Sequence, residues 1–213
     1  MRTGKFITFE GGEGSGKSTQ TELLSNRLSK NGVKTLKTRE PGGTVVGEKI
    51  RRILVEGTID SITPLSELLL HAASRWEHLN SVIEPTLATG CWVICDRFVD
   101  STTAYQGYGH QLGAAPVEMI NQLTLKNRIP DLTFILDLPV EKGLQRTKKR
   151  KGKEARYESM DLSFHERLRK GYLKIGQKNS KRCFVINALQ PIEETSKNIW
   201  DIASRCLPIT KNM

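Results

Sequence analysis

Short apolar runs alternate with stretches of helical periodicity along the whole chain. A run of about four to eight residues between polar or glycine-rich segments is typical of a buried β-strand. Five segments have this character, at residues 5–10, 33–38, 92–96, 132–138 and 182–187. Because helical patterns separate these runs, the sequence predicts an α/β fold in which helices cover both faces of a parallel sheet.

Capping residues mark the expected helices. A first helix is predicted over about 17–31, where Gly32 can end it in a left-handed conformation. Thr63 and Pro64 predict the start of a long helix, because threonine caps a first turn and proline fits its first position. No linker rich in proline, glycine or serine interrupts the 213 residues, so we expect a single domain over 1–213.

The segment after the first expected strand fits the phosphate-loop pattern GxxxxGK[ST]. Its glycines let backbone N–H groups surround a polyphosphate, and the following helix N-terminus adds positive charge. Lys17 is expected to reach the β- and γ-phosphates, and the Ser18 hydroxyl to bind Mg²⁺. The loop spans 11–19, and it predicts an ATP site formed by Gly11, Gly12, Glu13, Gly14, Ser15, Gly16, Lys17, Ser18 and Thr19.

The residues around Asp96 indicate the class of phosphate-loop protein. Asp96 ends the apolar strand 92–96 and is predicted to be an outer-shell ligand of Mg²⁺. GTPases need DxxG and NKxD motifs, and neither occurs in the chain. Motor ATPases carry a glutamate beside this acid, whereas Arg97 follows Asp96 here. An arginine at this place suits the binding of a second phosphorylated molecule, which favours a phosphotransferase.

Positive charge is concentrated in one part of the chain. The net charge is +10, and residues 141–182 hold 15 basic and 5 acidic residues, which accounts for all of it. Within this part, residues 146–156 contain seven basic groups and one acid. Three interpretations stay open: a nucleic-acid-binding surface, a solvated helix face, and a basic lid over phosphate groups.

Six motifs together resemble the thymidylate kinase family over nearly the whole chain. They are FEGGEGSGKST, TREPGGT, LLLHAASRWEHL, CDRFVDSTTAYQG, PDLTFILDL and NALQP, in the family's order. The resemblance implies a homodimeric P-loop fold of the adenylate-kinase type, with acceptor-binding regions at about 39–110 and a lid at about 146–158. It also implies Mg²⁺-dependent transfer of phosphate from ATP to thymidine monophosphate, a step towards dTTP by de novo and salvage routes. A kinase for another nucleoside monophosphate is the alternative.

The resemblance also implies roles for single residues. Arg97 and Arg51 bind the 5′-phosphate of the acceptor, and Arg75 hydrogen-bonds the edge of the thymine. His71 stands where a phenylalanine that stacks on the base is usual, and Tyr105 lies against the deoxyribose. The remaining acceptor-site residues are Glu40, Ser101, Thr102 and Gln106, and Glu13 of the phosphate loop reaches toward the sugar and phosphate of the acceptor. Without the resemblance, the two helix arginines could equally be solvated, and the segment around Tyr105 could be a surface loop.

One departure from some family members concerns the catalytic cation. Those members carry an arginine inside the phosphate loop, where this chain has Gly14. The cation is therefore expected from the lid, with Arg150 and Arg156 as candidates beside the catalytic residues Lys17, Glu13 and Arg97. A second departure is Leu189, at a position near the adenine where a small or acidic residue is common.

Composition limits the location of the protein. No apolar run approaches the roughly 18 residues of a membrane span, and the N-terminal segment does not resemble a signal peptide. The four cysteines form no CxxC pair and no zinc pattern, which predicts reduced thiols. We therefore expect a cytoplasmic protein with neither a membrane nor a nucleic acid as its partner.

Overall fold

Five parallel strands form the sheet of the computed structural model, which describes residues 4–56, 58–148, 156–207 and 209. The order across the sheet is β2-β3-β1-β4-β5, so the first strand lies at the centre. The strands are β1 (Phe6–Glu10), β2 (Thr35–Arg39), β3 (Trp92–Asp96), β4 (Leu132–Asp137) and β5 (Cys183–Asn187). Each expected strand is present, with ends that shift by at most two residues.

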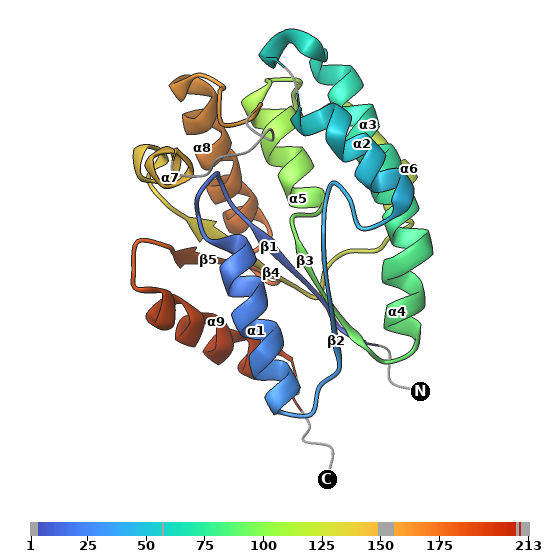
Figure 1. The fold of residues 1–213 in the computed structure, drawn as a ribbon, viewed down its shortest axis with the longest axis vertical. Helices are drawn as coiled ribbons and strands as arrows, with labels where there is room; N and C mark the ends of the chain where they lie inside the picture. The colour runs from blue at the N-terminus through green and yellow to red at the C-terminus, as the bar shows by residue number, and fades with distance from the viewer. Residues whose placement is uncertain (1–3, 57, 149–155, 208, 210–213) are drawn as a thin grey trace.

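Helices connect the strands and cover the sheet (Figure 1). Their bounds are α1 (Lys17–Lys30), α2 (Val45–Val55), α3 (Pro64–His78), α4 (Glu84–Ala88), α5 (Val99–Thr102), α6 (Ala114–Leu125), α7 (Val140–Thr147), α8 (Leu162–Lys178) and α9 (Ile192–Cys206). Shorter helical turns are η1 (Ile59–Ser61), η2 (Leu79–Ile83) and η3 (Thr103–Gly109). The expected cap is present at α3, where Thr63 accepts a hydrogen bond from the Ser66 amide.

Alternating side chains give the sheet an apolar core on each face. Ile7 and Phe9 of β1 pack into a cluster with residues of α1 and α9, whereas Phe6 packs into a cluster with residues of η2 and α4. On the second face, Ile135 of β4 packs with residues of α8. Each fully buried side chain of this kind contributes about 1.5–3 kcal/mol. The α/β fold with helices on both faces is thus confirmed.

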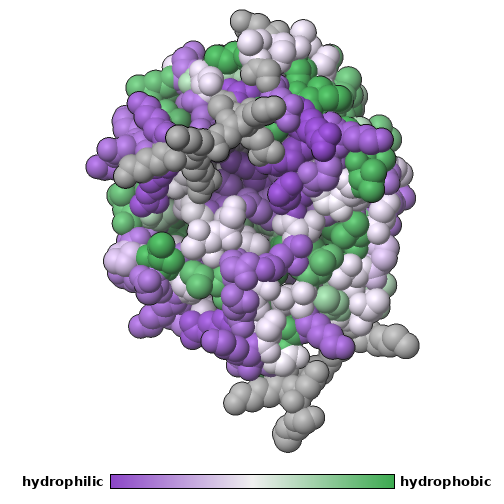
Figure 2. All heavy atoms as spheres, viewed as in Figure 1, coloured by the Kyte–Doolittle hydropathy of each residue, from purple (hydrophilic) through white to green (hydrophobic). Residues whose placement is uncertain are grey.

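The carboxyl edge of the sheet brings together the segments that carry the motifs. The phosphate loop joins the end of β1 to the start of α1 (Figure 1). Asp96 at the end of β3 lies in register with Arg39 of β2 and Phe9 of β1. Ligands of parallel sheets bind beyond this edge. Figure 2 shows a hollow lined by hydrophilic residues in the upper half of the same view.

Among the described residues, the helices are all too short or too polar to cross a bilayer.

Candidate active site

The phosphate loop holds the Lys17 side chain in a buried position. Its ammonium donates hydrogen bonds to the carbonyls of Gly11 and Gly12, at 3.2 and 2.9 Å, and to the Ser15 hydroxyl at 3.3 Å. Burial and the nearby charge of Arg97 lower the pKa of Lys17 to about 8. The Lys17 side chain is therefore mostly a charged ammonium at pH 7, and it loses its proton at only slightly higher pH.

Gly14 can only be glycine in this arrangement. Its φ of +66° lies in the left-handed region, and a Cβ at this position would lie 2.3 Å from the carbonyl oxygen of Gly143. An arginine at Gly14 would thus displace the helix α7 that carries Gly143. The close packing of α7 therefore leaves no room for an arginine at this position of the loop.

Ser18 and Asp96 are the residues whose oxygen atoms could hold a magnesium ion. The Ser18 hydroxyl donates a 2.6 Å hydrogen bond to Asp96 Oδ2, and both residues line the cavity above the phosphate loop. Hydroxyl and carboxylate oxygens fit Mg²⁺, which takes one or two protein ligands and completes its shell with water and phosphate. The described residues contain no cluster of three histidine, cysteine or acidic side chains, so an all-protein metal cage is not formed there.

Arg97 lies between the phosphate loop and the acceptor side of the site. Its guanidinium donates to Glu13 at 3.0 Å, to the Gly11 carbonyl at 2.9 Å and to the Tyr172 hydroxyl at 3.1 Å. It also lies 4.9 Å from the ring centroid of Tyr105, whose hydroxyl donates to Glu13. Although burial acts in the opposite direction, Arg97 and Lys17 lower the pKa of Glu13 to about 2.

Glu10 fixes the backbone around Arg97. Arg97 has a φ of +70°, a strained value for a residue with a side chain. The buried Glu10 carboxylate accepts hydrogen bonds from the Phe98 amide at 2.8 Å and the Ser101 hydroxyl at 2.5 Å. Burial and the neighbouring Asp100 raise the pKa of Glu10 to about 7. These bonds hold the strained turn in place.

A cavity of about 730 Å³ adjoins the phosphate loop on its acceptor side. Eight of the nine expected acceptor-site residues line it, namely Glu40, Arg51, His71, Arg97, Ser101, Thr102, Tyr105 and Gln106. Four further residues complete the lining: Pro41 and Val55 from the expected acceptor regions, and Tyr157 and Glu158 from the expected lid. The sequence predicted these ranges but gave the four residues no role at the acceptor.

Arg75, the ninth expected residue, lies behind this lining and is 1% exposed. It donates to Glu40 at 2.8 Å, to Thr102 Oγ1 at 2.8 Å and to the carbonyl of Phe98 at 3.2 Å. Its Nη1 has no hydrogen-bond partner among the described residues. A buried guanidinium nitrogen without a partner is costly, so this donor is suited to a ligand. The solvated alternative is excluded for Arg75.

His71 contacts the cavity as a neutral imidazole. Burial lowers the pKa of His71 to about 4. Its Nε2 lies 3.0 Å from the Tyr157 hydroxyl, and the two rings are 6.4 Å apart between centroids. The side chain is in place at the cavity wall, and its stacking on a base stays a prediction.

Of the two arginines expected to act from the lid, the structure describes only Arg156. Arg150 lies outside the described residues. Arg156 is 2% exposed and donates to Glu67 Oε2 at 2.6 Å and to backbone carbonyls of Leu54, Thr58 and Ile59. It does not line the phosphate cavity. The donors of Arg156 are thus bound to protein groups away from the phosphate cavity, and a catalytic role for this residue stays a prediction.

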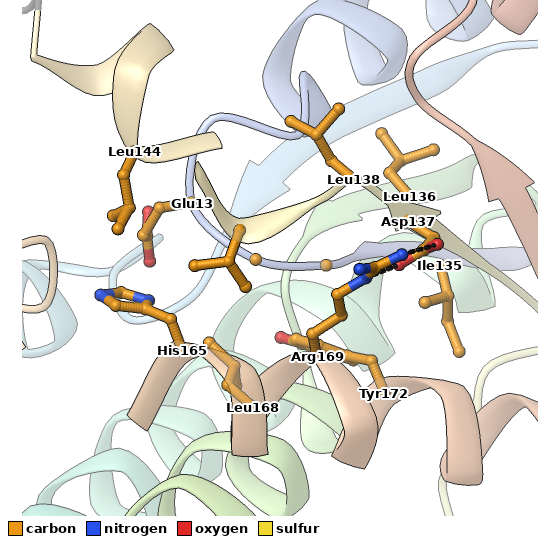
Figure 3. A pocket seen from close by; sticks show the side chains of 13 residues that line it. Glu13, Ile135, Leu136, Asp137, Leu138, Leu144, His165, Leu168, Arg169 and Tyr172 are labelled. Carbon is orange, nitrogen blue, oxygen red and sulfur yellow. Dashed lines mark hydrogen bonds and ion pairs between the residues drawn. The ribbon is translucent and has the colours of Figure 1, made fainter. Parts of the chain in front are cut away.

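A third, smaller cavity lies behind the phosphate loop (Figure 3). There the imidazole of His165 faces the carboxylate of Glu13, while Arg169 pairs with Asp137 at 2.8 and 2.9 Å. Burial lowers the pKa of His165. Tyr172, from the same helix α8, reaches Arg97 and Ser101. These helix residues could not be predicted from the sequence, because nothing in the helical pattern separates them from core positions.

Known proteins share both the sequence and the fold. A sequence model described as thymidylate kinase matches residues 9–199. The thymidylate kinase of Afipia carboxidovorans is 50% identical over 93% of this chain and 88% of its own length. That of Caulobacter vibrioides is 48% identical over 95% and 97%, respectively. The crystal structure of thymidylate kinase from Ehrlichia chaffeensis superposes with a TM-score of 0.77 at 36% identity, covering 95% of this chain and 99% of that one. The chain belongs to the thymidylate kinase family.

Proposed function

We propose that this chain transfers the γ-phosphate of ATP to thymidine monophosphate and releases thymidine diphosphate. One observation carries the proposal within the family: the phosphate cavity and the acceptor cavity share four lining residues, which are Glu13, Glu40, Arg51 and Arg97. Two phosphorylated ligands in these cavities would meet at this shared wall. Transfer between them depends on position and charge, with little covalent work for the protein.

The shared wall suits an in-line transfer. Lys17 would neutralise charge on the transferred phosphate, and Arg97 would hold the acceptor phosphate against it together with Arg51. Glu13 accepts hydrogen bonds from Arg97 and Tyr105, and so orients both towards the acceptor. The acceptor phosphate oxygen forms the new bond to phosphorus as the bond to ADP breaks.

Two buried polar atoms at the cavity are available to a base, a donor just behind the lining and an acceptor in the lining. The donor is Arg75 Nη1, and the acceptor is Gln106 Oε1; both are buried without a partner among the described residues. Thymine presents the complement, with a carbonyl oxygen at position 4 and an N–H at position 3. Cytosine presents an amino group and a bare nitrogen at the same places, and would leave buried polar groups unpaired. His71, Thr102 and Tyr105 would complete the contacts to base and sugar.

Magnesium and the lid complete the proposed site. Ser18 would bind Mg²⁺ directly, and Asp96 would bind it through a water molecule. The metal ion would offset the negative charge of the phosphates. Since Arg156 is bound elsewhere, Arg150 is the proposed catalytic cation. Arg150→Ala should lower kcat by about 10³-fold, while the KM for ATP changes little. A loss of kcat below tenfold would instead mean that the basic residues 146–156 form a solvated face without a catalytic role.

Two wider properties complete the proposal. A homodimer is supported by exposed apolar residues on the neighbouring helices α3 and α6. A cytoplasmic location fits four cysteines that are all free thiols.

A coupled assay of ADP release over a panel of nucleoside monophosphates tests the proposed function. Thymidine monophosphate should give the highest kcat/KM, and Lys17→Ala should remove the signal in a folded protein. Equal or faster reaction with a cytidine, adenosine or guanosine monophosphate would contradict the proposal. Binding to DNA at physiological salt would instead favour a nucleic-acid role for the basic segment.

A further inference from the structure

Glu67 of α3 is a buried carboxylate that binds both Gln106, in the lining of the acceptor cavity, and Arg156. Glu67 is 0% exposed. Its Oε2 accepts a 2.6 Å hydrogen bond from Arg156, and its Oε1 accepts a 2.6 Å hydrogen bond from the amide nitrogen of Gln106. His110 Nε2 lies 3.1 Å from the same Oε1. Burial alone would raise the pKa of Glu67, but the imidazoles of His110 and His71 and the bond from Arg156 hold it at about 2.

An ionised carboxylate only accepts hydrogen bonds, and this property fixes the orientation of the Gln106 side chain. The reversed amide would place two oxygen atoms 2.6 Å apart at Glu67, where a carboxylate has no proton to share. The amide nitrogen must therefore face Glu67. The carbonyl oxygen Oε1 is then the end left for a ligand, and Gln106 lines the acceptor cavity.

We propose that Glu67 is a specificity-determining residue: by holding the amide nitrogen of Gln106, it makes the cavity present an acceptor and so select a base with an N–H at position 3. The inference rests on the proposed function, because it assigns the origin of base selection at the same site. Glu67 touches no substrate in this account and acts only through Gln106. Arg156 has a supporting part, since it binds the other carboxylate oxygen and keeps Glu67 in place.

Glu67→Gln makes a sharp test because Arg156 dictates how the new amide must turn. Arg156 can only donate, so it should attract the oxygen of the new glutamine. The new amide nitrogen then faces Gln106, which must rotate and offer its own oxygen to it. The cavity would thereby present an N–H group in place of an oxygen, without any change in side-chain volume.

The measurement is the dissociation constant of thymidine monophosphate and of deoxycytidine monophosphate, by calorimetry on the full chain. For the unmutated protein we expect a strong preference for thymidine monophosphate. The ratio of interest is the dissociation constant of deoxycytidine monophosphate divided by that of thymidine monophosphate. Glu67→Gln should reduce this ratio about tenfold or more, mainly because thymidine monophosphate binds more weakly. Glu84→Gln is the matched control, since Glu84 is a half-exposed glutamate paired with Arg128, and this variant should keep the ratio.

Two further variants test the same role of Glu67 if the Glu67→Gln protein does not fold. Arg156→Met leaves Glu67 bound to Gln106 and should keep the ratio even if stability falls. Glu67→Gln combined with Arg156→Met removes the unpaired buried charge and frees the amide of Gln106 to take either orientation, so the ratio should again fall. An unchanged ratio in both proteins that carry Glu67→Gln would overturn the role of Glu67. The absence of any preference in the unmutated protein would overturn the proposed base recognition itself.

Discussion

At the scale of single residues, burial sets the charges on which the site depends. Lys17 is buried at the phosphate loop and close to Arg97, and both effects lower its pKa to about 8. The neutral form of a lysine is favoured above its pKa, so the ammonium is present at pH 7 and is lost as the pH rises. The affinity of the free enzyme for ATP should follow this titration.

The first prediction is therefore a pH dependence. The kcat/KM for ATP should be constant around pH 7 and fall as the pH rises above about 8, because the loop loses its ammonium. Steady-state rates between pH 6.5 and 10, with thymidine monophosphate saturating, provide the profile. A flat profile up to pH 10 would show that Lys17 keeps its charge despite burial.

Arg156 provides the second prediction, which concerns stability. Arg156→Ala leaves Glu67 as a buried charge without its main partner, and should lower the free energy of unfolding by about 3–5 kcal/mol. Arg128→Ala breaks a half-exposed pair with Glu84 and should cost at most about 1 kcal/mol. Urea denaturation of both variants decides the matter. Equal, small losses would mean that the Arg156 pair does not anchor this part of the chain.

At the scale of elements, α8 supports the acceptor site from behind. Its Tyr172 hydroxyl accepts a hydrogen bond from Arg97 and lies 2.8 Å from the Ser101 hydroxyl. Glu10 at the end of β1 binds the same serine. The guanidinium of Arg97 is thus oriented by groups from two elements distant in sequence.

The third prediction tests this support. Tyr172→Phe removes one hydroxyl and little volume, and should raise the KM for thymidine monophosphate about tenfold, because a bond to a charged group contributes about 1.5–3 kcal/mol. The KM for ATP should hardly change. Tyr108→Phe is the control, since Tyr108 lies over Lys174 on the outer side of α8. If the two variants behave alike, Tyr172 only packs in the core.

The elements differ in how far the sequence could predict them. The strands and the phosphate loop follow local rules, namely apolar runs and glycine at defined positions, and they were found within two residues. The acceptor residues were expected from the family resemblance, and eight of the nine line one cavity. Glu67 and Tyr172 could not be found, because their roles arise from contacts between helices distant in sequence. The pairing of Arg156 with Glu67 could not be predicted either, because a basic run does not reveal which of its members is paired inside the fold.

At the scale of the whole molecule, one face carries apolar side chains that nothing covers in the described structure. On α3 these are Leu65, Leu69 and Trp76, and on the adjacent α6 they are Met119 and Leu123, which are 70% and 72% exposed. Their spacing of four or seven residues places them in stripes along each helix. Exposed apolar patches of this kind are typical of protein interfaces.

The fourth prediction is that this face forms the homodimer. Sedimentation equilibrium should give about twice the chain mass of 23.9 kDa at micromolar concentration. Leu123→Asp should shift the protein to the monomer, because a charge would be buried without a partner. Lys178→Asp on α8, away from this face, should leave the dimer intact. A monomer in the unmutated protein would contradict the assignment.

The proposed function is that one chain brings ATP and thymidine monophosphate to the residues shared by the two cavities and moves a phosphate between them. Its most direct test is product analysis: the chain is mixed with thymidine monophosphate and ATP labelled at the γ-phosphorus, with Mg²⁺ present. The account predicts that the label appears in the β-phosphate of thymidine diphosphate, with one ADP formed for each diphosphate, and that Lys17→Ala forms neither. Release of the label as inorganic phosphate, with thymidine monophosphate unchanged, would contradict it.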